Sequence, residues 1–84
     1  MRMRVKLLLF AGCREAVGSK ELELELPETV SSVGEAFEVV LERFPQLRGI
    51  SKSVAIARNA EYVSGNAPVS DGDELAIIPP VSGG

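Results

Sequence analysis

The sequence predicts a small α+β domain in which one main helix crosses one face of a mixed β-sheet. Residues 20–26 alternate charged residues with leucine, which is typical of a strand with one solvated face. Residues 33–44 place apolar side chains at the spacing of a single helical stripe. Residues 4–10 and 74–78 form the most apolar strands, as expected at the centre of a sheet. We therefore expect the first and last strands to lie side by side and parallel.

The first third of the chain predicts a β-hairpin with a short helix in its connection. Residues 4–10 begin as an alternating strand and end fully apolar. Residues 11–17 can form two helical turns, and Gly18 is a suitable C-cap because glycine adopts the left-handed conformation without a steric penalty. The strand over residues 20–26 ends at Pro27, which has no N–H group to donate to a sheet.

The main helix is predicted by its start, its apolar stripe and its end. Ser32 and Glu35 have the three-residue spacing of a capping box. Pro45 ends the helix because its ring clashes with the preceding turn and it lacks a donor. The stripe between these signals, which we expect to pack on the sheet rather than to bind a cofactor, comprises Val33, Ala36, Phe37, Val40, Leu41 and Phe44.

The second half of the chain predicts short strands joined by turns. We expect a loop at 47–53, a strand at 54–58, a turn at 59–61, a brief strand at 62–63, a tight turn at 70–73 and the last strand at 74–78. Gly72 suits a positive φ in the tight turn. A right-handed crossover through the main helix then gives a β-grasp, or ubiquitin-like, roll over residues 1–78.

The last six residues, Pro79-Pro80-Val81-Ser82-Gly83-Gly84, predict a flexible, extended C-terminal tail over 79–84. The two prolines keep the backbone extended, and the two glycines leave an end thin enough for a channel that excludes a Cβ. At roughly 3.3 Å per residue the segment spans about 20 Å. Two interpretations stay open from this segment alone: a frayed terminus, or an arm that carries the terminal carboxylate into another protein's active site.

Composition excludes several classes of function. The 84 residues suffice for one domain, and the net charge of −3 disfavours binding to a phosphate backbone. The single cysteine excludes an internal disulfide, a cysteine zinc cage and an iron–sulfur cluster, which also excludes a β-grasp ferredoxin. The absence of histidine removes the usual general base and the commonest metal ligand. We expect neither a self-contained hydrolase nor a metal site.

The N-terminus has a weak likeness to an export signal that we do not favour. Residues 1–6 are basic, and residues 5–11 are mostly apolar, ending before Gly12 and Cys13. The apolar run is at the lower limit for a signal peptide, and its cleavage would delete the best central strand. No segment has the ~20 apolar residues that span a bilayer. We expect a cytoplasmic protein.

Strand alternation predicts an apolar patch on the face of the sheet away from the helix. If Leu7 and Leu9 face the helix, then Leu8 and Phe10 face away from it. The same alternation in the last strand turns Ala76 and Ile78 outward, and Tyr62 is expected nearby. A patch of a few hundred Å² at the exit of the tail indicates a binding surface. A shifted register or covering loops would be the alternative explanation.

Two further groups of residues are weaker candidates for a site. Asp71, Asp73 and Glu74 match no EF-hand spacing, and a turn explains them better than a cation site does. Cys13 lies beside Arg14, which would lower the thiol pKa, but we expect Cys13 to be a small buried residue at the start of the short helix.

Four segments carry a resemblance to a known family: LFAGCREAVG at 9–18, Asn59 before Tyr62-Val63, DGDELA at 71–76 and PPVSGG at 79–84. They resemble the small subunit of molybdopterin synthase, which belongs to the ubiquitin-like sulfur carriers. The resemblance covers nearly the whole chain, although the stretch from Ser19 to Ser53 matches only in pattern. Cys13 occupies a variable position of the family and inherits no role.

The resemblance implies a non-catalytic carrier whose chemistry takes place at its last residue. An adenylating activating enzyme, similar to those of the ubiquitin pathway, would use ATP to convert the Gly84 carboxylate into an acyl-adenylate. A sulfur donor protein would then displace AMP and leave a thiocarboxylate. The large subunit of the synthase would bind the carrier and direct this sulfur to cyclic pyranopterin monophosphate. The chain itself would bind no cofactor, metal, nucleic acid or membrane.

The resemblance also assigns expected roles to single residues. Gly84 would carry the sulfur, Gly83 and Ser82 would form the thin end, and Pro79, Pro80 and Val81 would set the direction of the tail. Phe10, Tyr62 and Ile78 would anchor both the activating enzyme and the large subunit, with Arg14 as a polar contact at the rim. Two other classes stay open: a sulfur carrier for thiamine, cysteine or tRNA thiolation, and a ubiquitin-like binding module with no carrier role.

Overall fold

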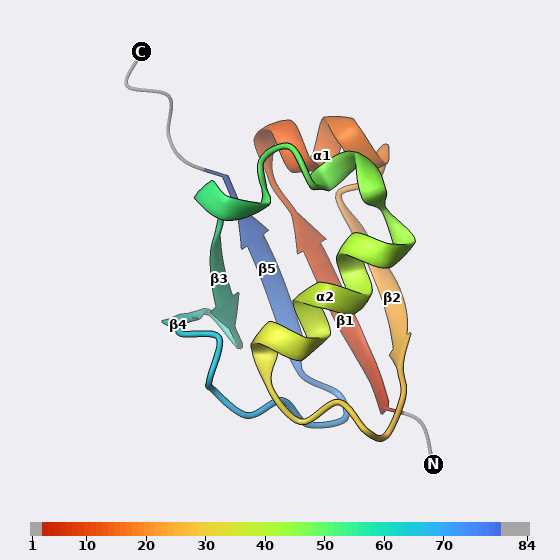
Figure 1. Cartoon of the computed structure of the whole chain (residues 1–84), viewed down its shortest axis with the longest axis vertical. Coiled ribbons are helices and arrows are strands. Elements are labelled where there is room, and N and C mark those ends of the chain that lie inside the picture. Colours follow the sequence, from red (N-terminus) through yellow and green to blue (C-terminus); the bar gives the residue numbers. More distant parts are fainter. Residues whose placement is uncertain (1–2, 80–84) are drawn as a thin grey trace.

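A computed structural model describes residues 3–79 and shows a five-stranded mixed sheet with one long helix lying across it (Figure 1). The strands are β1 (Met3–Leu9), β2 (Glu21–Leu26), β3 (Ala55–Arg58), β4 (Glu61–Val63) and β5 (Glu74–Ile78). The α-helices are α1 (Ala11–Val17) and α2 (Val33–Arg43), and two short 3₁₀ turns are η1 (Pro45–Leu47) and η2 (Ser51–Ser53). The predicted tail begins at Pro79, and residues 80–84 lie outside the described part of the chain.

The sheet has the strand order β2-β1-β5-β3-β4. Strands β1 and β5 are adjacent and parallel, with Leu7 opposite Leu75, and the other neighbouring pairs are antiparallel. The prediction that the first and last strands lie together is therefore confirmed, and so is the β-grasp arrangement of a hairpin, a crossing helix and a returning strand.

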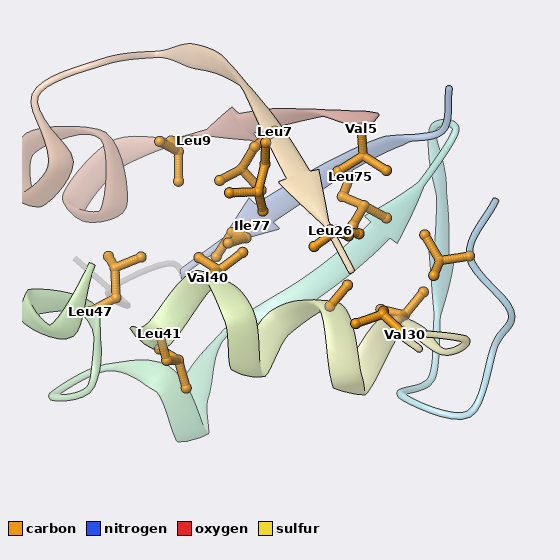
Figure 2. Close-up of a cluster of buried hydrophobic side chains, with 14 of the residues drawn as sticks. Val5, Leu7, Leu9, Leu26, Val30, Val40, Leu41, Leu47, Leu75 and Ile77 are labelled. Atoms are coloured by element: carbon orange, nitrogen blue, oxygen red, sulfur yellow. The ribbon is translucent and has the colours of Figure 1, made fainter. Parts of the chain in front are cut away.

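One face of the sheet packs against α2 and forms the core (Figure 2). Alternate residues of the strands point to this face, because successive side chains in a strand point in opposite directions. Val5, Leu7 and Leu9 are at most 2% exposed, which confirms the predicted alternation of β1. Leu75 and Ile77 lie beside them in β5, and Val40 of the helix lies next to Ile77 (Figure 2).

The start of α2 satisfies the N–H groups of its first turn, which have no partner within the helix. The predicted capping box is present: the Glu35 N–H donates to the Ser32 Oγ at 3.2 Å, and the Glu35 carboxylate accepts from the Ser32 N–H at 3.2 Å. The N–H groups of Val33 and Gly34 donate to backbone carbonyls of the β4–β5 loop at 2.8 and 2.9 Å. The beginning of the helix is thereby tied to a loop more than thirty residues away.

The carboxylate of Glu35 is the centre of this cap. It also accepts hydrogen bonds from the backbone N–H and the hydroxyl of Ser31, each at 2.9 Å. These bonds, followed by those from Ser32, lower the pKa of Glu35 below its ordinary value. The cap therefore depends on the ionised form of this side chain.

We expect the variant Glu35→Gln to lose part of the acid sensitivity of the fold. Because the folded pKa of Glu35 lies below its unfolded value, its contribution is full above the unfolded pKa and disappears as the pH falls through the folded pKa. Urea denaturation across the acid range measures this, and Glu38→Gln on the same helix is the control. A variant whose stability falls with acid as steeply as that of the wild type would contradict the expectation.

The segment that follows α2 differs from the predicted loop at 47–53 by containing 3₁₀ turns. Pro45 ends α2 as expected but also starts η1, because the first position of a helical turn needs no N–H donor. Leu47 is 1% exposed and packs into the core, and the Gln46 side-chain amide donates to the Ala16 carbonyl at 3.1 Å. The segment is thus anchored to the core and to α1 rather than free.

The short helix α1 forms at the predicted residues. Gly18 ends it in the left-handed conformation, with φ of 89°, and its N–H donates to the Arg14 carbonyl at 2.7 Å. Cys13 on this helix is fully buried in the core cluster. Burial raises the pKa of its thiol, so the alternative of a pKa lowered by Arg14 is not supported, and the expectation of a small buried residue is confirmed.

Candidate functional site

The face of the sheet opposite α2, which we call the open face, carries an apolar row that crosses four strands. The pairings Leu8 with Ala76, Ala76 with Ala57 and Ala57 with Tyr62 place these side chains in one line. Ala57 and Ala76, at the middle of this row, are 6% and 8% exposed. The row therefore has a flat alanine floor between a leucine and a tyrosine.

A second row begins where β5 ends. Ile78 pairs with Ala55 of β3, and both lie on the open face next to the first row. Phe10 follows the last residue of β1 in extended conformation, so the alternation of β1 carries its ring to the same face. The predicted patch of Leu8, Phe10, Ala76, Ile78 and Tyr62 is thus confirmed as one side of the sheet.

Two aromatic side chains stand out from this patch. Phe10 is 46% exposed and Tyr62 is 72% exposed, and they are the exposed large hydrophobic residues of the described chain. They come from opposite sides of the patch, Phe10 from the end of β1 and Tyr62 from the edge strand β4. Exposed rings around a flat apolar floor are typical of a surface that a protein partner covers.

Charged residues occupy the other half of the open face. Lys6 pairs with Glu23 on one side and with Glu74 on the other, and its Nζ lies 3.3 Å from the Glu21 carboxylate. Both members of this ion pair are about half exposed, so it adds little to stability. Its position between the strands limits the apolar patch to the end of the sheet at which β1 and β5 finish.

The predicted tail leaves the sheet at this same end. Strand β5 has no neighbour beyond Ile78, because its pairing with β1 ends at Leu9 and Ile77 and its pairing with β3 ends at Ala55 and Ile78 (Figure 1). Pro79 is half-buried and is the last described residue. The predicted roles of Pro80, Val81, Ser82, Gly83 and Gly84 therefore concern residues outside the described range.

Arg14 is the remaining described residue of the predicted site, and the acidic turn is where the sequence favoured a turn over a cation site. Arg14 is exposed on α1, which follows directly after Phe10. The Asp71 carboxylate accepts from the Arg4 N–H at 2.7 Å, and the Asp73 carboxylate accepts from the Ser70 N–H at 2.7 Å. A turn thus uses both aspartates, and residues 3–79 contain no group of side chains suited to a metal ion.

The interior holds a cavity too small for a substrate. Its volume is about 10 Å³, which is room for about one water molecule. Its walls are apolar and consist of Leu7, Val33, Phe37, Val40, Ile56, Leu75 and Ile77.

Among the described helices, none is long and apolar enough to cross a membrane.

The sequence reasoning missed two parts of the site. The first part is the contribution of β3, in which Ala57 forms the floor of the patch together with Ala76 and Ala55 lies beside Ile78. The alternation of residues 54–58 predicts that Ala55 and Ala57 share a face, but not that this strand neighbours β5. The second part is the set of hydrogen bonds that join Asn59 to Asp73 and Glu74. No local pattern indicates these bonds, because the partners are 14 and 15 residues apart.

Comparison with known proteins assigns this chain to a family. The ThiS family model matches residues 7–84. The molybdopterin synthase sulfur carrier subunit of Arabidopsis thaliana is 40% identical over 98% of this chain and 84% of its own length. The protein of the same name from Aedes aegypti is 43% identical, with 98% and 90% covered. The solution structure of the small archaeal modifier protein 1 of Methanosarcina acetivorans has a TM-score of 0.76, with 30% identity, covering 100% of this chain and 99% of that one.

Proposed function

This chain belongs to the ThiS family, and we propose that it is the sulfur carrier subunit of a molybdopterin synthase. The observation that carries the proposal is the 40% identity to a curated subunit of that name over 98% of the chain. The fold adds support, because it presents one exposed apolar patch beside the point at which the tail leaves the sheet. A carrier needs both a surface that binds its partner and a C-terminal segment long enough to enter the partner's active site.

The proposed chemistry takes place at Gly84. Its carboxylate attacks the α-phosphate of ATP on an activating enzyme, which releases pyrophosphate and forms an acyl-adenylate. Hydrosulfide (HS⁻), released by a sulfur donor protein, then attacks the acyl carbon. The new carbon–sulfur bond forms as the carbon–oxygen bond to AMP breaks, and AMP leaves with one of the former carboxylate oxygens. The product is a thiocarboxylate, whose sulfur is more nucleophilic than the oxygen that it replaces.

The partners supply the catalytic groups in this proposal. The chain has no histidine, and Cys13 is fully buried with a raised thiol pKa, which leaves it unsuited to nucleophilic attack. We propose that the large subunit of the synthase covers the open face and takes the tail into its active site, where cyclic pyranopterin monophosphate accepts the sulfur. Exclusion of water there protects the thiocarboxylate from hydrolysis. Because activation consumes ATP, we place the carrier in the cytoplasm.

Intact mass spectrometry tests the carrier role directly. The purified chain is incubated with its activating enzyme, ATP and a sulfur source, and we expect a gain in mass equal to the exchange of one oxygen for one sulfur. Omission of ATP is the control and should leave the mass unchanged. A chain that keeps its mass under all conditions is a binding module and not a carrier.

The pathway is tested separately by complementation. Rescue of a strain that lacks the small subunit of molybdopterin synthase supports the proposed assignment. Rescue only of a strain that lacks the carrier for thiamine, cysteine or tRNA thiolation would keep the chemistry but move it to another acceptor.

A second candidate function is the covalent modification of proteins. The likeness to the small archaeal modifier protein 1 of M. acetivorans over the whole chain favours it. In that role the activated Gly84 would form an amide bond with a lysine of a target protein, with loss of AMP. Trypsin would leave residues 59–84 attached to the modified lysine, because Arg58 is the last basic residue of the chain. Peptide mass spectrometry of proteins from cells that express the chain would find this branched fragment if the modification occurs, and its absence would leave the sulfur carrier role alone.

A further inference from the structure

Left-handed backbone conformations adjoin both exposed aromatic residues of the open face. Among the described residues other than glycine, positive φ occurs at Ala11 (47°), directly after Phe10, and at Asn59 (50°) and Ala60 (72°), shortly before Tyr62. An alanine in this region is strained, because its Cβ lies close to the neighbouring backbone carbonyl oxygen. Such residues persist only where the surrounding structure holds them.

The β3–β4 turn is held by the side chain of Asn59. Its amide Nδ2 donates to the Asp73 carboxylate at 3.1 Å, and its Oδ1 accepts from the Glu74 N–H at 3.0 Å. The Asn59 backbone N–H also donates to the Glu74 carbonyl at 2.8 Å. One residue therefore joins the turn to the start of the central strand β5 through three hydrogen bonds.

Asp73, which receives the Asn59 amide, is itself fixed. Its carboxylate accepts from the Ser70 N–H at 2.7 Å and lies 3.8 Å from the Arg58 Nε. The Arg58 guanidinium also donates to the Pro68 carbonyl. The clamp formed by Asn59 and Asp73 thus rests on the loop before β5 and on the last residue of β3.

Tyr62 has little else to position it. It lies in a strand of three residues at the edge of the sheet, paired only with β3 in the described structure, and its side chain is 72% exposed. A ring with so few packing contacts takes its place from the backbone that carries it. That backbone emerges from the turn that Asn59 holds.

We propose that Asn59 is a positioning residue for partner docking: its clamp to Asp73 and Glu74 fixes the β3–β4 turn so that Tyr62 stands in line with Leu8 before a partner arrives. A ring that is already in place loses less conformational freedom on binding, which strengthens association. The inference rests on the proposed function, because Tyr62 needs a fixed place only if the open face docks onto the large synthase subunit.

The variant Asn59→Gly separates the clamp from the backbone preference. Glycine adopts the positive φ without strain, so the turn can still form, but both side-chain hydrogen bonds are removed. Asn66→Gly is the matched control, because Asn66 is an exposed loop residue whose side chain makes no hydrogen bond within the described chain. Asn59→Asp is a second variant, which keeps the acceptor but sets a carboxylate against that of Asp73.

Amide hydrogen exchange measures the positioning without any partner. We expect the amides of β4 in Asn59→Gly to exchange at least about tenfold faster than in the wild type, while those of β1 and β5 stay protected. Asn59→Asp should show the same local change, and Asn66→Gly should show none. Unchanged exchange of β4 in Asn59→Gly would overturn the proposal, and so would uniformly faster exchange, since that marks a general loss of stability.

Binding to the purified large synthase subunit then tests whether the positioning acts through Tyr62. We expect Asn59→Gly to weaken binding about fivefold, Tyr62→Ala to weaken it more, and the double variant to bind no worse than Tyr62→Ala alone. Additive losses would overturn the proposal, because Asn59 would then act independently of the ring. If Tyr62→Ala binds as the wild type does, the docking face of the proposed function is wrong, whereas the exchange experiment still decides whether Asn59 holds the hairpin.

Discussion

Deletion of Gly84 is expected to abolish sulfur transfer while the fold survives. The deletion shortens the proposed arm by about 3.3 Å, and a misplacement of about 1 Å at a reacting centre can already cost a factor of about 10² in rate. The fold should persist because the buried core ends at Ile77 among the described residues, and the last hydrogen-bonded strand ends at Ile78. A reconstituted synthase assay and a thermal melt measure the two effects.

The same deletion has a built-in control. Because Phe10, Tyr62 and Ile78 are unchanged, the shortened chain should still bind the large subunit and should compete with the intact carrier in the assay. Glu38→Ala, on the helix side of the molecule, should retain full transfer activity. Full sulfur transfer by the chain without Gly84 would refute the proposed site of attachment, and loss of the fold would show that the last residues serve stability.

The fold was predictable because its strongest signals are local. The capping box needs only Ser32 and Glu35, and the left-handed cap at Gly18 needs only one glycine after a short helix. The alternation of β1 predicted correctly that Leu7 faces the core and that Leu8 does not. The same alternation placed the apolar patch on the open face, since side-chain direction in a strand follows from parity alone.

The features that escaped prediction depend on contacts distant in sequence. Pro45 could be assigned as the end of α2, but the turns after it form because Leu47 packs into a core that the rest of the chain builds. The left-handed conformation of Ala60 contradicts the local preference of alanine and persists next to the clamp between Asn59 and Asp73.

The variant Phe10→Ala is expected to lose partner binding rather than stability. The ring of Phe10 is 46% exposed in the free protein and lies at the edge of the patch, so a partner would bury most of the area that is still open. An aromatic anchor of this kind typically contributes about 2 kcal/mol or more to binding, which is about thirtyfold in affinity. The free energy of unfolding should fall by only about 1 kcal/mol or less.

The adjacent residue provides the matched comparison. Leu9 is 2% exposed and points into the core, so Leu9→Ala should lower the free energy of unfolding by about 3 kcal/mol. That is a large share of the total of about 5–10 kcal/mol expected for a domain of this size. Partner binding by the fraction of Leu9→Ala that remains folded should change little, because the side chain does not reach the open face.

The two neighbours thus separate docking from folding. Both variants are measured by calorimetric titration with the large subunit and by urea denaturation. We expect Phe10→Ala to lose affinity and keep its stability, and Leu9→Ala to lose stability and keep its affinity. If Phe10→Ala loses stability as Leu9→Ala does, its ring belongs to the core and the open face ends at Leu8 and Tyr62. If Phe10→Ala keeps both stability and affinity, the partner covers another surface, and the docking face must be sought away from the end of β1.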